Sequence, residues 1–199
     1  MRIAIVIAVT AISLSAQTPP SSATYIPLTS SQRWEQYRHD TFLSPGLYFA
    51  AIGYAGGAQL YKRPPEWGQG MTAYEKRAGT FLATYAIQYS VRDGAAAALG
   101  YDPRYLHCEC TGGGRRLAHA LLWSFLTKNE AGRTRLNIPM VAGDYAGEMI
   151  PYLWFPKRYS PLKDGFRDGS QEVGITVGLN IFREFAPEFR RLIRAVPNP

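Results

Sequence analysis

Hydrophobic and polar positions alternate with the periodicity of an α-helix along most of the chain, and the longest such stretch runs from Thr72 to Leu99. Thr72 and Glu75 have the spacing of a capping box, which begins a helix, and no charge occurs between residues 78 and 91. Small side chains recur there at steps of three or four, opposite four large ones: Gly79, Ala83, Ala86, Ser90, Gly94 and Ala97, against Phe81, Leu82, Tyr85 and Tyr89. We therefore predict a central buried helix over 72–99, with a close neighbour on its small stripe.

A second stretch, residues 41–61, contains no charged residue at all. It is long enough to span a membrane, and Gly53 and Gly57 have the spacing of closely packed transmembrane helices. It also contains Pro45 and Gln59, and the mean hydropathy of the whole chain is only −0.18. We favour a helix buried against the small stripe of 72–99, and a membrane helix is the alternative.

Four further helices complete the predicted fold. They cover residues from about 31 to Pro45, about 114–128, about 137–153 and about 165–195, with Asn137 and Pro139 opening the third of these and Pro187 bending the last. Proline and glycine place turns at residues 63–70 and 101–105. The fold class is all-α: a compact bundle of about five or six Gly/Ala-rich helices around the central helix.

The first residues are typical of a secretory signal peptide. Arg2 is followed by an uncharged run from Ile3 to Leu14 and by the small residues Ser15 and Ala16. The apolar run is shorter than the ~20 residues that span a membrane, although an uncleaved anchor is the alternative. We expect a signal peptide at 1–16, a flexible Pro/Ser-rich lead at 17–30 and a single helical domain at 31–196. The mature protein is then exported, and either periplasmic or associated with an envelope membrane.

Charge narrows the class of partner. The chain has 22 Lys and Arg against 15 Asp and Glu, a formal net charge of +7. The basic residues often come in pairs: Lys62-Arg63, Lys76-Arg77, Arg115-Arg116, Lys157-Arg158 and Arg190-Arg191. Because an exported protein does not meet nucleic acid, the candidate partners are an anionic membrane surface or an acidic envelope protein. The interpretation that we favour for the pairs themselves is that they only cap and solubilise apolar helices.

Four short segments carry a resemblance to a known group of proteins. They are Pro65-Glu66-Trp67-Gly68, Tyr74 to Arg77, Asp102-Pro103-Arg104-Tyr105, and Asn180-Ile181-Phe182-Arg183-Glu184-Phe185. Together they resemble a family of uncharacterised exported proteins found in acidobacteria, over most of the mature chain. The resemblance implies an exported helical protein. The family has no assigned activity, so the resemblance implies no catalytic residue, and Cys108 and Cys110 lie outside its motifs.

One short cluster has the residue types of a metal site. His107, Cys108 and Cys110 lie together, and His119 follows on the next predicted helix. Thiolates with imidazole bind zinc or copper(I), but a C-x-C pair lacks the second pair of a zinc ribbon. In an exported protein the two cysteines instead form a disulfide or stay as free thiols. We predict no cofactor, with a metal bound by these four residues as the alternative.

Catalytic candidates are few. Asp144 and Glu148 lie one helical turn apart, as do Arg115 and His119, so two carboxylates and a histidine could face each other. Glu66 and Arg104 are weaker candidates, both in turns. We expect Asp102 and Arg104 to pair with each other, and Arg104 to reach carbonyls at the end of the central helix near Ala98 and Leu99.

The sequence contains none of the common nucleophile, phosphate-loop, zinc-protease or dinucleotide motifs. Our leading hypothesis is a non-catalytic exported protein that associates with an envelope membrane or an envelope partner. The alternative is a hydrolase or metal-dependent enzyme that uses His119 with Asp144 and Glu148, helped by Glu66 or Arg104.

Overall fold

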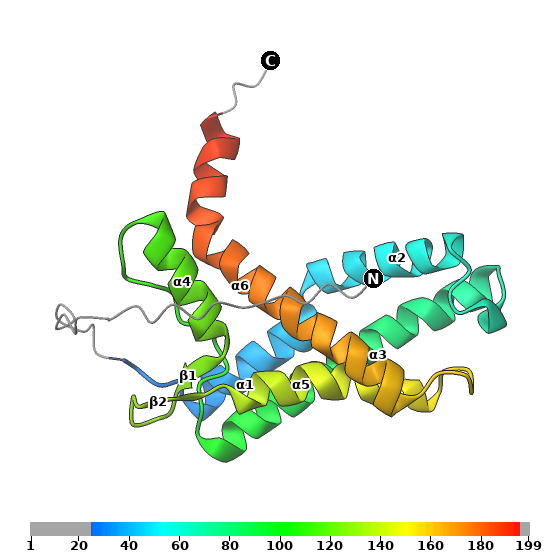
Figure 1. Ribbon diagram of the computed structural model, residues 1–199, viewed down its shortest axis with the longest axis horizontal. Coiled ribbons are helices and arrows are strands. Elements are labelled where there is room, and N and C mark those ends of the chain that lie inside the picture. The colour runs from blue at the N-terminus through cyan, green and yellow to red at the C-terminus, as the bar shows by residue number, and fades with distance from the viewer. Residues whose placement is uncertain (1–24, 196–199) are drawn as a thin grey trace, which may run out of the picture.

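The computed structural model describes the backbone of residues 25–195 and the side chains as far as Phe189. In chain order the elements are α1 (Ser30–Arg38), α2 (Pro45–Leu60), α3 (Met71–Leu99), α4 (Gly113–Ser124), β1 (Leu126–Lys128), β2 (Thr134–Leu136), α5 (Ile138–Met149) and α6 (Phe166–Ala195) (Figure 1). Single π or 3-10 turns occupy His39–Leu43, Pro65–Trp67, Ile150–Leu153 and Pro161–Gly165. The predicted signal peptide at 1–16 and residues 17–24 of the predicted lead lie outside the described residues.

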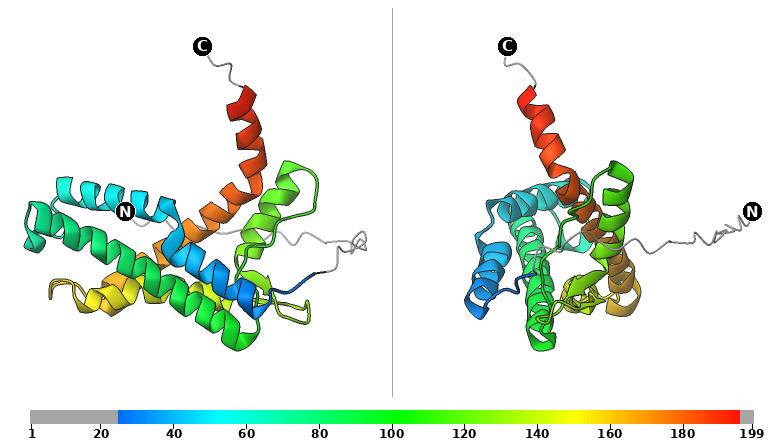
Figure 2. Two further views of the ribbon diagram at one scale, coloured as in Figure 1. Left: turned by 180° about the vertical axis from the view of Figure 1, so that it is seen from behind. Right: turned by 90° about the vertical axis from the view of Figure 1, so that its left-hand side faces the viewer.

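Helix α3 is the centre of the bundle, as predicted. It packs most extensively against α5 on one side and α2 on the other, and α5 packs in turn against α6. The end-on view in Figure 2 shows α3 between α1 with α2 and α5 with α6. Helix α4 rests on α6, which contains Pro187 and changes direction along its length (Figure 1). The all-α fold class is confirmed.

The one departure from an all-helical chain, among the described residues, is a short β-hairpin. The predicted helix over 114–128 was wrong at its end, because α4 stops at Ser124 and residues 126–128 pair antiparallel with 134–136. A turn closed by Gly132, with φ of +72°, reverses the chain between the strands. The hairpin is anchored by the Asp102 amide, which donates to the Lys128 carbonyl at 2.8 Å. Backbone pairing with a distant segment therefore overrides the local helical pattern.

The capping box predicted at the start of α3 is wrong. The helix begins at Met71, directly after Gly70 in a positive-φ conformation, so Thr72 lies inside the first turn and its side chain caps nothing. A capping box forms instead at α1, where Thr29 and Gln32 exchange both hydrogen bonds. Thr29 belongs to the predicted flexible lead, and this contact ties the end of that lead to the bundle.

Close helix contact comes from the glycines of α5, whereas the small stripe of α3 was predicted to provide it. A Cβ built at Gly79 or Gly94 meets no atom within 4 Å, so that prediction was wrong for these positions. A Cβ at Gly143 would lie 2.7 Å from the Gln88 carbonyl, and one at Gly147 would lie 2.8 Å from the Gln88 Cβ. The backbone of α5 therefore presses directly on α3 around Gln88.

The buried interior is strongly polar. Its buried apolar side chains are mostly small. Many other buried side chains are polar or charged, among them Arg77, Thr80, Gln88, Asp102, Ser124, Thr127, Asp144, Thr176, Asn180 and Glu184. Asn180 of α6, for example, donates to the Ser124 hydroxyl of α4 at 3.1 Å. Since buried polar groups are costly unless hydrogen-bonded, these contacts fix which helix faces pair.

Arg77 fastens the turn between α2 and α3. Its guanidinium is fully buried and donates to the carbonyls of Arg63, Pro64 and Gly68, and to the side chain of Gln59. Four acceptors on a reversing chain match the fixed fork of an arginine. This member of the predicted basic pairs therefore holds backbone carbonyls inside the protein.

Candidate functional site

A cavity of about 510 Å³ lies between α2, α3, α6 and the turn that follows α5. We call it the acidic cavity. Its lining combines an aromatic and aliphatic wall with carboxylates and one amide: Ala50, Tyr54, Thr80, Phe81, Thr84, Tyr85, Gln88, Glu148, Pro151, Tyr152, Phe155, Asp168, Glu172, Ile175 and Leu179. We call the part of the lining that carries Glu148, Asp168 and Glu172 its floor. None of these lining residues carries a positive charge.

The carboxylates reach the cavity because of the helical spacing on α5 and α6. Glu148 lies one turn after Asp144 on α5, and Glu172 lies one turn after Asp168 on α6. The close approach of α5 brings the Gln88 side chain between them. Its amide donates to Asp144 Oδ1 at 2.8 Å and to Glu172 Oε1 at 3.1 Å. One amide of the central helix thus joins acids from two other helices.

Burial shifts the pKa of several of these acids upward. Burial, followed by the negative charges of Glu172, Asp168 and Asp144, raises the pKa of Glu148 to about 7. Burial also raises the pKa of Glu172 and of Asp144. Among the described residues, Glu148 makes no hydrogen bond or ion pair, and Oδ2 of Asp144 is buried without a hydrogen-bond partner. The cavity therefore holds more negative potential than its own side chains neutralise.

Another part of the lining is an aromatic wall. Tyr54 and Phe81 have ring centroids 5.1 Å apart, and Phe81 stacks on Tyr85 at 6.3 Å. Tyr152 and Phe155, at 4.8 Å, close the side formed by the turn after α5. Ring faces carry negative charge density, so this wall has the same electrostatic preference as the carboxylates.

His119 lies elsewhere, so the predicted histidine–carboxylate set is not assembled. Its ring stacks on Trp123 of the same helix, with centroids 5.3 Å apart, and meets Tyr105 edge-on. Burial lowers its pKa, and the charges that act on it are those of Glu184 and His107. Asp144 and Glu148 instead belong to the α5 side of the bundle. The structure brings the two carboxylates together and gives the histidine other partners.

Cys108 and Cys110 form a disulfide, one of the alternatives left open by the sequence. Their sulfurs are thereby bonded to each other, and His107 lies with its Nδ1 3.5 Å from the Glu184 carboxylate. Across residues 25–195, no group of three or more His, Cys, Asp or Glu residues is arranged to hold a metal ion. The four predicted metal ligands therefore do not form one site.

Sequence reasoning missed the role of Glu184. This carboxylate on α6, with 2% of its side chain exposed, accepts from the Tyr105 hydroxyl at 2.8 Å, the Cys108 amide at 3.2 Å and the Arg116 Nε at 3.3 Å. Despite its burial, these hydrogen bonds lower its pKa. The available signal was the four-residue spacing of Thr176, Asn180 and Glu184, which marks a polar stripe along α6.

Asp102 and Arg104 pair as predicted, with Nη2 and Oδ2 2.6 Å apart. Asp102 also accepts from the Arg104 amide and from the hydroxyl of Tyr25. Arg104 donates to the Ile26 carbonyl, whereas we predicted that it would reach the end of the central helix. The pair therefore fastens the first described residues of the chain to the bundle, and it lines no part of the acidic cavity.

Glu66 also lies apart from the cavity lining. It forms an ion pair with Arg158, Nε to Oε1 at 2.9 Å, and the two side chains are 44% and 51% exposed. Solvent surrounds both groups, so this pair is a surface contact between two loops. Of the five predicted catalytic candidates, only Glu148 lines the acidic cavity, and Asp144 lies one turn before it on the same helix.

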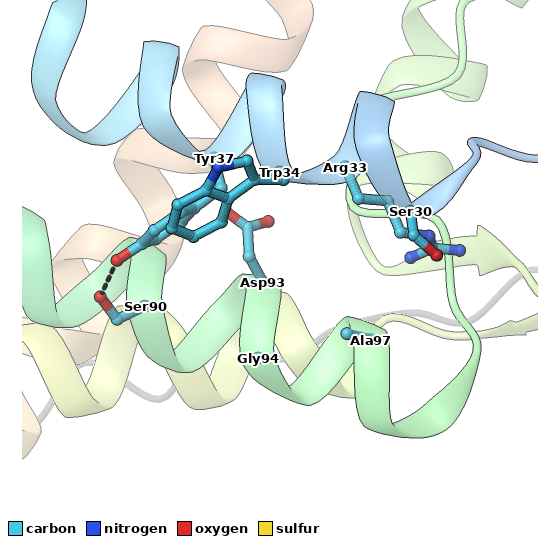
Figure 3. Close-up of a pocket in the computed structure, with 8 residues that line it drawn as sticks. All are labelled: Ser30, Arg33, Trp34, Tyr37, Ser90, Asp93, Gly94 and Ala97. Carbon is cyan, nitrogen blue, oxygen red and sulfur yellow. Dashed lines mark hydrogen bonds between the residues drawn. The ribbon is translucent and has the colours of Figure 1, made fainter.

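A second pocket, of about 360 Å³, separates α1 from the C-terminal half of α3. Figure 3 shows Trp34 and Tyr37 of α1 above Gly94 and Ala97 of α3, with a hydrogen bond of 2.8 Å between the hydroxyls of Tyr37 and Ser90. The small stripe predicted to receive a helix therefore faces this pocket over part of its length.

Helix α2 has two apolar faces. Its inner face, with Leu47, Ala51 and Ala55, is buried against the bundle. Its outer face presents Phe49 and Ile52 to solvent with 74% and 57% of their surface exposed, and other exposed side chains flank them: Phe42, Leu43, Tyr48, Leu60 and Tyr61. A helix that is apolar all round is normally enclosed, so this outer face lacks a partner within the described chain.

Within residues 25–195 no helix combines the length and hydrophobicity that crossing a membrane requires. Comparison of the chain with protein-family models, with curated proteins and with solved structures finds no match. The resemblance to exported acidobacterial proteins stays a prediction.

Proposed function

We propose that this protein is a non-catalytic exported protein of the cell envelope that associates with an anionic membrane surface. The carrying observation is the exposed apolar outer face of α2, centred on Phe49 and Ile52. Inserting this face into the headgroup boundary would remove two large side chains from water, each contributing about 1–2 kcal/mol.

The flanks of α2 favour an anionic surface over a neutral one. Arg38 precedes the apolar segment, and Lys62 and Arg63 follow it directly; all three are exposed. Aromatic residues at both ends, such as Phe42 and Tyr61, match the composition of the membrane–water boundary. Each basic residue near such a surface contributes about 1 kcal/mol at moderate ionic strength.

The arrangement of His119 supports a non-catalytic protein over the alternative hydrolase. The acid–base set that the hydrolase needs would combine His119 with Asp144 and Glu148, and the histidine is engaged with Trp123 and Tyr105 instead. General acid–base catalysis requires its groups within hydrogen-bond reach of one reacting centre.

The experiment is a sedimentation assay of the exported form with vesicles of phosphatidylglycerol and phosphatidylethanolamine at low salt. We expect the protein to bind these vesicles, and we expect the binding to weaken as salt is added. Binding should also be weaker to vesicles that contain only neutral lipid, because charge contributes to the affinity. The double variant Phe49→Ser with Ile52→Ser should bind at least tenfold more weakly. Leu136→Ser is the matched control, because Leu136 is equally exposed at 66% but lies on β2.

A protein that stays wholly in the supernatant with anionic vesicles at low salt would contradict the membrane proposal. Such a result, together with co-purification of an envelope protein lost in the α2 double variant, would identify a protein partner instead. Equal weakening by Leu136→Ser would show that general hydrophobicity, and not the outer face of α2, drives the association.

A further inference from the structure

We propose that the acidic cavity binds an organic cation: a protonated or quaternary amine that carries an apolar chain. The inference is independent of the membrane proposal, because it concerns the inside of the bundle and not its outer surface. It rests on three properties of the cavity, namely its size, its charge and its aromatic wall.

The size suits a small amphiphile. A volume of about 510 Å³ lies within the range of about 300–1,000 Å³ of small-molecule sites. Ile175 and Leu179 on one side and Tyr54 on the other are about half exposed, so they form an apolar mouth that opens the cavity to the exterior. An alkyl chain would contact these residues while its head group reaches the floor.

The charge of the floor selects a cation. Glu148, Asp168 and Glu172 line the cavity, and no lysine or arginine does. Asp168 is paired with Arg167 and accepts from the Tyr152 hydroxyl. Glu148 and Glu172 have no basic partner among the described residues, and only Glu172 accepts from the Gln88 amide. Like charges without a counter-charge in a half-buried site create an attractive potential for a positive head group.

Behind this floor lies an unpaired acceptor. Asp144 is fully buried, takes the other hydrogen bond of the Gln88 amide, and leaves its Oδ2 without a partner. Asp144 is not itself part of the cavity lining, so the buried polar set beside the floor is incompletely paired.

The aromatic wall selects the kind of cation. Tyr54, Phe81 and Tyr85 form a continuous row of rings. Tyr152 and Phe155 add a second pair of rings, and the Tyr152 hydroxyl donates to the Asp168 carboxylate. Rings and carboxylates together favour an ammonium group that carries alkyl substituents. Such a group loses its bound water easily and binds to the faces of aromatic rings.

The test is calorimetric titration of the exported form with octyltrimethylammonium, below its micelle concentration and at pH 8. Octyl sulfate and octanol serve as probes of equal chain length with a negative and a neutral head, and tetramethylammonium as the head group alone. The double variant Glu148→Gln with Glu172→Gln removes the charge and keeps the shape. Glu75→Gln is the matched control, since Glu75 is exposed on the same bundle.

We expect octyltrimethylammonium to bind at least tenfold more tightly than octanol or octyl sulfate, and at least tenfold more tightly than tetramethylammonium. The double variant should lose at least tenfold in affinity, and Glu75→Gln should bind as the parent does. Equal binding of the three octyl probes, or unchanged affinity in a double variant shown to be folded by circular dichroism, would overturn the proposal. Failure of vesicle binding alone would leave this titration unaffected.

Discussion

Two groups of buried carboxylates in this bundle have opposite surroundings. Glu184, at the junction of α4 and α6, accepts hydrogen bonds from Arg116, Tyr105 and a backbone amide, and these lower its pKa. Glu148, in the acidic cavity, has other acids as its nearest charges, and burial raises its pKa to about 7. Both lie at helix–helix contacts, so burial alone does not distinguish them.

This difference in surroundings distinguishes a carboxylate that holds helices together from one that belongs to a binding site. A buried carboxylate with donors on every oxygen holds elements together, because breaking the set would strand a charge. A carboxylate buried beside other acids costs free energy in the folded state, and such a cost is typical of positions kept for binding. The following variants test this comparison, from the largest expected effect to the smallest.

The largest effect is expected for Glu184→Gln. The amide keeps the shape but replaces one acceptor oxygen by a donor, which then faces the Tyr105 hydroxyl or the Arg116 guanidinium. We expect the free energy of unfolding to fall by about 2–3 kcal/mol, measured by urea denaturation at pH 7. A variant as stable as the parent would show that this carboxylate fastens nothing.

The same substitution at Glu148 should have the opposite sign. The pKa of Glu148 is about 7 in the folded protein against 4.5 unfolded, so the folded state holds more protons between these values and loses stability as pH rises through them. Glu148→Gln should therefore stabilise the protein by about 1–2 kcal/mol at pH 8 and by almost nothing at pH 4. Denaturation curves of both proteins at the two pH values measure this difference. A destabilised variant at pH 8 would contradict the comparison.

The smallest effect is expected for Glu66→Gln. Its ion pair with Arg158 has good geometry at 2.9 Å, but both side chains are about half exposed. We expect a change below about 0.5 kcal/mol in the free energy of unfolding, because water replaces the lost contact. A loss as large as that of Glu184→Gln would show that pairing, and not burial with pairing, sets the strength of these contacts.

Sequence patterns succeeded where the deciding interactions are local. The course of α3 and α5 follows from helical periodicity, and the cap of α5 follows from Asn137, whose side chain accepts from the Met140 amide. The pairing of Asp102 with Arg104 joins residues two apart across a turn that Pro103 forces. In each case the partners are fixed by neighbouring backbone geometry, so the sequence alone determined them.

The acidic cavity was only half predictable for the same reason. The spacing of Asp144 and Glu148 places both on one side of α5, but nothing local indicates that Gln88 of α3 and Glu172 of α6 meet them there. Spacing equally suggested His119 as their partner, and the packing of α4 against α6 places that ring elsewhere. Which helix faces meet depends on contacts distant in the sequence.

The glycines show the division between sequence and tertiary structure most clearly. Gly53 and Gly57 on α2 have the same four-residue spacing as Gly143 and Gly147 on α5. Only the α5 pair lies against another backbone, while a Cβ at either α2 position meets nothing within 4 Å. The sequence determined the helices and the absence of bulky side chains at these positions. The tertiary structure decided whether another helix packs against them. Close packing depends on the surfaces of two helices, whereas a sequence pattern describes only one of them.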